Sequence, residues 1–145
     1  MNLTPHFTLK EMTISQTAVR MGIDNTPNAR QITHLTRLCE NILEPLRTIV
    51  GKPINVSSGF RNPTVNALVG GSSRSQHMKG EAADFTVEGF TVQQLFDLVR
   101  TSGLPYDQLI LEFDAWVHVS FGPRNRRQAL IFFKNTQNRT VSRTA

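Results

Sequence analysis

Three short stretches in the second half of the chain alternate apolar and polar residues, and this alternation constrains the fold more than any other feature. The stretches are residues 82–87 (AADFTV), 108–113 (QLILEF) and 116–121 (WVHVSF). Successive side chains of a β-strand point to opposite faces of a sheet, so each stretch would have one apolar face. The short gap between the last two stretches favours a tight hairpin. The pattern therefore predicts an antiparallel sheet that buries one face.

The opposite faces of these predicted strands carry ionisable side chains. Asp84, Glu112 and His118 alternate with the apolar residues of their strands. If the apolar faces share one core, these three side chains point to the other side of the sheet. Fold stability does not require acids and an imidazole there, so the pattern indicates the floor of a functional cleft. The residues assigned to the apolar faces are Ala83, Phe85, Val87, Leu109, Leu111, Phe113, Val117, Val119 and Phe121.

Helical signals precede the strands. Residues 8–21 form a weakly patterned candidate helix. In a second helix, Thr26 would be the N-cap and Pro27 the first position, where a missing N–H does no harm. Pro45 should kink this helix or end its regular part. The single cysteine, Cys39, lies on the apolar stripe of this helix and is expected in the core.

The remaining elements complete an α+β pattern. Residues 53–58 predict a short strand, and residues 62–68 a short helix. Thr91 and Gln94 form a capping box for a helix that Gly103 is placed to end. We therefore expect a single α+β domain in which helices pack around a mainly antiparallel sheet.

The composition fits one globular domain. The chain has 145 residues, of which 39% are hydrophobic and 19% are charged, and a chain of this size can bury its own core. No apolar run reaches the length of a membrane span, and the first residues lack the pattern of a secretory leader. We expect a monomer that is made in the cytoplasm without a signal peptide. A single cysteine excludes an internal disulfide.

Charge divides the chain into two parts. Residues 1–114 carry ten Lys or Arg and eleven Asp or Glu, whereas residues 115–145 carry six basic residues and no acid. We divide the chain into a catalytic core at 1–121 and a basic extension at 122–145 that includes a last strand at 128–133. A solvated tail explains this charge, and adsorption to an anionic envelope is the alternative. No nucleic-acid-binding motif accompanies the extension, which disfavours a nucleic-acid partner.

Two histidines and an aspartate form the motif that carries chemistry. His77 and Asp84 lie in the segment SQHMKGEAAD, and His118 lies in WVHVS. Two imidazoles and a carboxylate suit zinc, and three protein ligands leave a fourth position for water. Neutral imidazoles and one carboxylate leave such a centre with a net positive charge, which lowers the pKa of bound water. By contrast, His6 and His34 have no acid or strand context, and we interpret them as surface or core residues.

Three separated elements carry a family resemblance that spans roughly residues 30–121. They are SGFR at 58–61, SQHMKGEAAD at 75–84 and WVH at 116–118. In this order they resemble the family of zinc D-Ala-D-Ala dipeptidases and carboxypeptidases, which includes phage endolysins that cut the L-Ala–D-Glu bond. The resemblance implies a fold shared with the hedgehog signalling domain. It also implies that the zinc ligands are His77, Asp84 and His118.

The same resemblance assigns roles around the metal. Arg61 matches an arginine near the substrate carbonyl or carboxylate, a role that suits a guanidinium fork, and an ion pair within the loop is the alternative. Ser75 matches a substrate-side serine, although a turn or cap hydroxyl is the structural alternative. Trp116 lies on the face of His118 and is expected to contact substrate. Gly80 should provide a backbone conformation that reverses the ligand loop.

The catalytic base departs from the family pattern. Many members place an acid three residues before the last histidine, where this chain has Ala115. Glu112 and Asp114 are the nearby acids. Alternation places Glu112 on the face of His118, and cross-strand pairing with residue 116 or 118 would bring it to the metal. Asp114 has the same parity but falls in the expected turn, where Asp is common. We predict Glu112 as the base and keep Asp114 as the alternative.

These assignments predict a zinc-dependent peptidase that hydrolyses peptidoglycan stem peptides. The first candidate is a phage or prophage endolysin that cuts L-Ala–D-Glu, and it would act on the cell wall. The second is a bacterial D-Ala-D-Ala carboxypeptidase. A third candidate, of another class, is a non-catalytic wall- or partner-binding protein that keeps the hedgehog-like fold.

Overall fold

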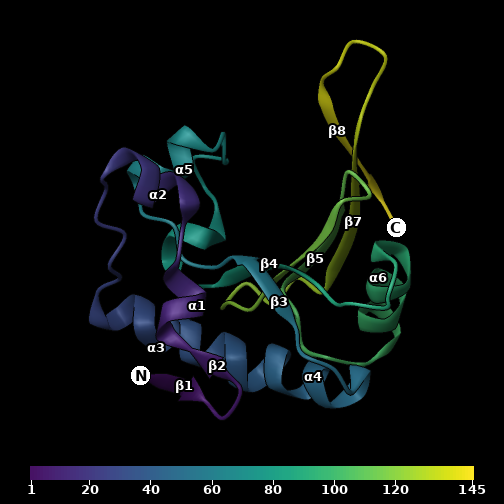
Figure 1. The fold of residues 1–145 in the computed structure, drawn as a ribbon. Coiled ribbons are helices and arrows are strands. Elements are labelled where there is room, and N and C mark those ends of the chain that lie inside the picture. The colour runs from purple at the N-terminus through teal and green to yellow at the C-terminus, as the bar shows by residue number, and fades with distance from the viewer.

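The computed structural model describes residues 1–145 and is built on one six-stranded sheet (Figure 1). Neighbouring strands are antiparallel except β5 and β7, which are parallel. The α+β class and the mainly antiparallel sheet expected from the sequence are therefore confirmed. In spatial order the strands are β3 (Asn55–Ser58), β4 (Ala82–Thr86), β6 (Trp116–Ser120), β5 (Gln108–Glu112), β7 (Gln128–Lys134) and β8 (Thr140–Thr144).

One face of the sheet is covered by helices and forms the core. α3 (Ala29–Leu38), a π-helical turn η1 (Cys39–Leu43) and α4 (Glu44–Val50) run beneath the sheet in Figure 1, and α6 (Val92–Thr101) packs at its side. Burial of these apolar faces together is the main stabilising contribution. Cys39 lies in this core as expected, and burial raises the pKa of its thiol to about 12. The sheet contributes Ala83, Phe85, Leu109, Leu111, Val117 and Val119, and Val87 joins the core directly after β4.

The long second helix differs from its sequence prediction at its first turn. It begins after Asn28, whose side chain caps the helix in a capping box with Gln31. Thr26 instead hydrogen-bonds to Asp24, so the predicted cap was wrong by two residues. Near Pro45 the regular α-helix is interrupted, as predicted, although the chain remains helical. The π-helical turn widens the helix just before the proline, which accommodates a residue without an N–H.

The N-terminal part contains two short helices where the sequence predicted one. β1 (Asn2–Thr4) and β2 (Phe7–Thr8) form a small separate sheet, and α1 (Leu9–Thr13) and α2 (Gln16–Met21) follow. Extended backbone at Ile14 ends α1, and the Ser15 hydroxyl caps α2. The interruption by a capping serine explains why the helical pattern of this stretch is weak.

The elements nearest the site follow their predictions closely. α5 (Pro63–Leu68) begins after the cap Asn62, and Thr91 and Gln94 form the predicted capping box of α6. The β5–β6 hairpin turns through Phe113 and Asp114, both with positive φ. Phe113 was assigned to the apolar sheet face and instead packs edge-on against Trp116, because the turn removes it from the strand.

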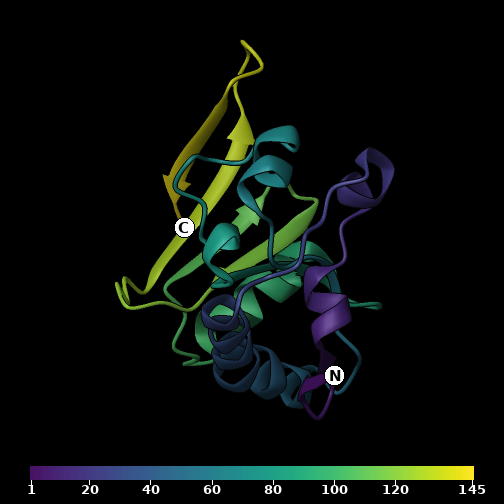
Figure 2. The same cartoon turned by 90° about the vertical axis from the view of Figure 1, so that its left-hand side faces the viewer.

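The C-terminal residues extend the sheet as an arm (Figures 1 and 2). β7 confirms the predicted last strand and joins the sheet beside β5. β8 was not predicted; it pairs only with β7, through antiparallel hydrogen bonds. The loop between them projects away from the rest of the molecule. None of the helices has both the length and the apolar character needed to cross a membrane.

Candidate metal centre

The loop before β4 presents His77. A short 3₁₀ helix, η2 (Gln76–Lys79), carries it, and the Ser75 hydroxyl caps this helix by accepting a hydrogen bond from the His77 N–H. Gly80 ends the helix with φ of 74°, and a Cβ there would lie 2.5 Å from the Gln31 carbonyl oxygen. The sequence-based role of Gly80 in reversing the loop is thus observed. The Ser75 hydroxyl makes the capping hydrogen bond that was its structural alternative, and its contact with substrate stays a prediction.

Adjacent strands present Asp84 and His118. The two residues are direct cross-strand partners in the β4–β6 ladder. Their side chains therefore project from the same face of the sheet, opposite the core. The Nδ1 atom of His118 lies 2.9 Å from Oδ1 of Asp84. The alternation in the sequence predicted this shared face. The register of β4 and β6 places Asp84 directly opposite His118 and so brings the two side chains into contact.

His77 completes a compact group of three potential ligands. Its Nε2 atom lies 3.3 Å from Oδ1 of Asp84. The facing atoms of His77, Asp84 and His118 all lie within 4.8 Å of one another. Two ligands bound about 2.0–2.2 Å from one tetrahedral zinc ion are themselves roughly 3.3–3.6 Å apart, which is near the observed spacing. The donor set and its spacing therefore fit zinc.

Burial and hydrogen bonding prepare these groups for a cation. The three residues are between 2% and 7% exposed. Burial lowers the pKa of His77 and favours its neutral form. Burial alone would raise the pKa of Asp84, but the two imidazoles hold it well below its usual range. Neutral imidazoles and an ionised carboxylate are the protonation states that zinc requires.

A backbone carbonyl orients His77 from behind. Nδ1 of His77 lies 2.7 Å from the carbonyl oxygen of Gly59. A carbonyl can only accept, so Nδ1 carries the proton and Nε2 is left to face Asp84. Gly59 itself lies against the Met12 backbone, where a Cβ would clash with the carbonyl oxygen. The glycine of the SGFR element therefore permits a close approach that orients a ligand.

Glu112 lies beside this group, and Asp114 does not. Glu112 pairs with Trp116 across the hairpin, and its Oε1 lies 3.6 Å from Nδ1 of His118. Burial raises the pKa of Glu112, and the charge of Asp84 raises it further. Asp114 is exposed at the tip of the hairpin. The geometry thus favours Glu112 over Asp114 as the proton acceptor.

Arg61 and Trp116 supply two buried donors near the same face. Nε of Arg61 and Nε1 of Trp116 are buried without a hydrogen-bond partner. Burial lowers the pKa of Arg61, while the charges of Asp84 and Glu112 oppose that effect. Unpaired buried donors are costly, so both N–H groups are suited to bind an acceptor on a ligand.

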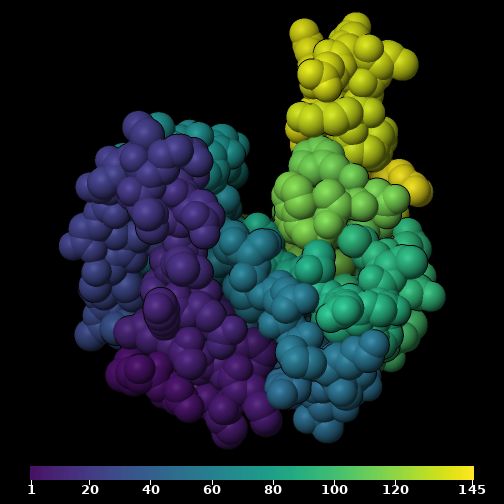
Figure 3. Space-filling view, viewed as in Figure 1, coloured from purple at the N-terminus to yellow at the C-terminus, as the bar shows by residue number.

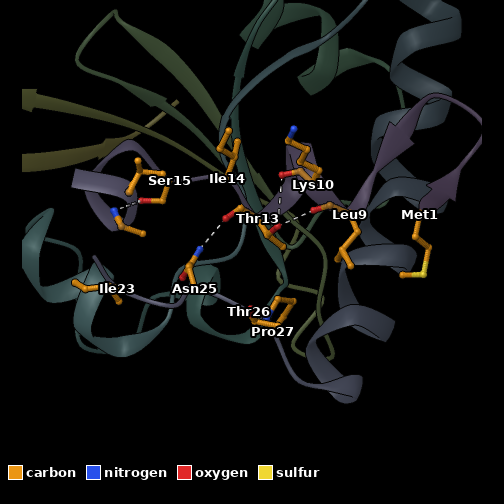
Figure 4. Close-up of a pocket in the computed structure, with 12 residues that line it drawn as sticks. Met1, Leu9, Lys10, Thr13, Ile14, Ser15, Ile23, Asn25, Thr26 and Pro27 are labelled. Carbon is orange, nitrogen blue, oxygen red and sulfur yellow. Dashed lines mark hydrogen bonds between the residues drawn. The ribbon is translucent and has the colours of Figure 1, made fainter. Parts of the chain in front are cut away.

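The sheet face that carries the site, opposite the covering helices, opens into a hollow that is separate from a pocket near the N-terminus (Figures 1 and 3). Figure 3 shows the hollow between a lobe that includes α2 and α5 and a lobe that carries β7 and β8. Figure 4 shows a separate pocket of about 430 Å³ between α1, α2 and residues 23–27, which contains none of the predicted site residues. Asn25 stands in it and donates to the Thr13 carbonyl oxygen at 2.8 Å. The same amide donates to the Phe60 carbonyl oxygen and so fixes the loop that carries Arg61.

Other ionisable residues lie outside the centre. His6 pairs with Glu44, and Nδ1 of His34 contacts the Lys79 carbonyl oxygen, so neither histidine joins the three potential ligands.

Sequence reasoning missed a cluster formed by Gln76, Asp107 and Arg126. Its members are far apart in the chain and follow no motif, so only the adjacency of Gln76 to His77 could have drawn attention to it.

Two imidazoles, a carboxylate and a neighbouring acid beside one sheet face form a group suited to metal-dependent hydrolysis. The family described as Peptidase M15 matches residues 5–120, which is most of the chain. The chain belongs to this family of zinc metallopeptidases, as the three sequence elements predicted. A 43-residue stretch is 54% identical to the zinc D-Ala-D-Ala carboxypeptidase of Streptomyces albus G. That stretch covers 29% of this chain and 17% of the Streptomyces protein, so only a small part of that relative is matched.

Proposed function

We propose that the protein is a zinc peptidase that hydrolyses the stem peptides of peptidoglycan. The observation that carries the proposal is the convergence of one ligand atom each from His77, Asp84 and His118 within 4.8 Å of one another, beside the sheet face opposite the core. Nε2 of His77 and Nδ1 of His118 both face Oδ1 of Asp84. Nothing in the packing of the core requires these groups, and the chain's own hydrogen bonds already orient His77. In this proposal the three residues are the zinc ligands.

The residues around the ligands have complementary roles in peptide hydrolysis. Bound zinc would supply Lewis acidity and lower the pKa of water. Glu112 would accept the proton of the attacking water and return it to the leaving nitrogen, a role that its raised pKa favours. The unpaired N–H groups of Arg61 and Trp116 would hold the substrate carbonyl or carboxylate. Ser75 would contact the substrate from the rim of the ligand loop.

The bond that is cut has two candidates. An L-Ala–D-Glu endopeptidase of the endolysin type is our first proposal, because a basic arm beside the hollow suits an enzyme that works on an intact anionic envelope. A D-Ala-D-Ala carboxypeptidase is the second, and the named activity of the Streptomyces relative supports it. In either case the cell wall is the proposed place of action.

Mass spectrometry of products from purified peptidoglycan tests both activities in one assay. Cleavage of L-Ala–D-Glu would release peptides that begin with D-Glu, whereas carboxypeptidase action would release single D-Ala residues. The zinc-loaded protein should give one of these product sets, and the chelated protein neither. If the zinc-loaded protein binds peptidoglycan without releasing any fragment, the non-catalytic wall-binding alternative replaces the peptidase.

A further inference from the structure

A second charge cluster, centred on the buried Asp107, contacts the loop that carries His77 and includes Arg126 of the C-terminal segment. The Asp107 side chain is fully buried. Its Oδ1 accepts from the backbone N–H and from Nε of Arg126, both at 2.8 Å. Its Oδ2 accepts from Nη2 of Arg126 at 3.0 Å and from Nε2 of Gln76 at 2.9 Å. The carboxylate thus accepts two hydrogen bonds from the guanidinium of Arg126, one from the Arg126 backbone and one from the Gln76 amide.

Gln76 connects this cluster to the ligand loop. Its side chain also accepts from Nη2 of Arg126 at 3.2 Å, so the amide is held at both ends. Gln76 directly precedes His77 and begins the 3₁₀ helix that carries it. Its backbone carbonyl accepts from the N–H of Glu81 at 3.0 Å, which closes the loop before β4. A movement of Gln76 would therefore move the imidazole of His77.

Close packing of Gly122 supports the same connection. A Cβ at Gly122 would lie 2.9 Å from Nε2 of Gln76 and 3.1 Å from Oε1 of Glu81. The first residues after β6 are thus pressed against the amide of Gln76. This segment lies beyond residue 120, where the family match ends.

We propose that Asp107 and Arg126 are positioning residues that set the direction of His77 through Gln76. The inference rests on the proposed function, because it concerns how well His77 can serve as a zinc ligand. The Gly59 carbonyl fixes the ring through Nδ1, and the Gln76 amide fixes the backbone that carries the ring. Outer partners of metal ligands commonly contribute to metal affinity through orientation of this kind.

If the ion pair of Asp107 and Arg126 only stabilised the fold, variants at positions 76 and 126 would give different results. It would require only that Asp107 and Arg126 attract each other, which a lysine at 126 could maintain. Positioning requires the planar guanidinium, because Arg126 contacts Asp107 and Gln76 together. Three variants separate these roles: Gln76→Leu removes the link, Arg126→Lys keeps the charge, and Arg126→Ala removes both. Arg124→Ala is the matched control, since Arg124 is an exposed arginine two residues away.

The experiment measures zinc affinity by competition with a chelator, together with the visible absorption of the cobalt-substituted protein. Gln76→Leu and Arg126→Lys should each bind zinc roughly tenfold more weakly and show an altered cobalt spectrum while unfolding near the wild-type temperature. Arg124→Ala should match the wild type in both measurements. Wild-type zinc affinity and cobalt spectra in both Gln76→Leu and Arg126→Lys would overturn the positioning role, even if Arg126→Ala fails to fold. If the wild type hydrolyses peptidoglycan in that case, the proposed function stands, whereas a wild type that binds no zinc would remove both proposals.

Discussion

Ionisable residues are concentrated both on the sheet floor around Asp84 and in the C-terminal segment 122–145, but they are buried on the floor and mostly exposed in the segment. On the floor, His77, Asp84 and His118 are almost completely buried and face one another. In the C-terminal segment, every basic residue except Arg126 is exposed. Buried polar groups have a large energetic cost unless they are paired, whereas exposed charges cost little and contribute little to stability. The buried groups of the floor are therefore suited to bind a metal and react with a substrate in direct contact. The exposed basic residues of the segment are suited to attract an anionic surface from a distance.

Removal of a potential ligand should have the largest effect. We expect His77→Ala and Asp84→Ala to lose bound zinc and all detectable peptidase activity, because two ligands cannot retain the ion at the affinity of three. Elemental analysis of the purified variants measures the zinc. Added zinc should also raise the unfolding temperature of the wild type and not that of Asp84→Ala, because only a protein that binds the ion is stabilised by it.

His6→Ala is the control for the loss of a histidine. His6 is exposed and pairs with Glu44, far from the three potential ligands. This variant should keep full zinc content and activity. Full zinc occupancy in His77→Ala or Asp84→Ala would show that the convergence on the sheet floor is not the metal site.

Loss of the proposed base should have the next largest effect. Glu112→Gln keeps the shape of the side chain and removes its ability to accept a proton. We expect turnover to fall by roughly two to four orders of magnitude while zinc content is unchanged. Steady-state kinetics on a defined stem peptide measures the effect.

Asp114→Asn is the matched control for the same chemical change. Asp114 is exposed in the hairpin turn, where Asn also tolerates positive φ. Its turnover should remain within a few fold of the wild type. The opposite outcome, an inactive Asp114→Asn and an active Glu112→Gln, would exchange the roles of the two acids.

Alternation in the strands, together with the family resemblance of three separated elements, predicted the residues that the structure brings together at the site. Alternation placed Asp84, Glu112 and His118 on one face, because a strand has only two faces and the apolar residues identify the inner one. The family resemblance implied that Gly80 reverses the ligand loop, and Gly80 ends the short helix that carries His77. These features depend on residues close together in the chain, and the sequence shows them directly.

The features that sequence reasoning missed depend on distant partners. β8 is stabilised as a strand by pairing with β7. Its residues are mostly exposed and polar, and Val141 is its one apolar side chain, so no apolar alternation identifies it. The contacts of Asp107 with Gln76 and Arg126 join residues 31 and 19 positions apart. Tertiary pairing of this kind has no periodic signal, so only the folded chain reveals it.

Acid should weaken the one buried ion pair of the C-terminal segment. Burial would raise the pKa of Asp107, but the hydrogen bonds from Arg126 lower it below its usual range. A depressed pKa means that the carboxylate stabilises the fold above its unfolded pKa of about 3.9 and that this contribution is lost as the pH falls through the folded pKa. Asp107→Asn should therefore lower the free energy of unfolding by about 2–3 kcal/mol at pH 7, and the difference from wild type should shrink below pH 4.

Urea unfolding of both proteins at pH 7 and pH 3 measures this change. Comparison of the two cancels the titration of all other carboxylates, which the proteins share. Asp114→Asn serves again as the control and should show little difference from wild type at either pH. A difference for Asp107→Asn that is equally large at both pH values would mean that the charge of Asp107 does not stabilise the fold.

Removal of the exposed charges of the arm should have the smallest effect, and it should affect only the binding of intact cell walls. Lys134, Arg139 and Arg143 are exposed on or between β7 and β8. A triple change of these residues to Gln keeps the strands, unlike truncation, which would expose the edge of β7. We expect a severalfold loss of binding to whole cell walls at low salt and almost none at 0.3 M salt, where charges farther apart than the Debye length of ~6 Å are screened. Turnover on a soluble stem peptide should be unchanged. An equal loss on walls and on the soluble peptide would assign the arm a structural role and remove the contrast with the sheet floor.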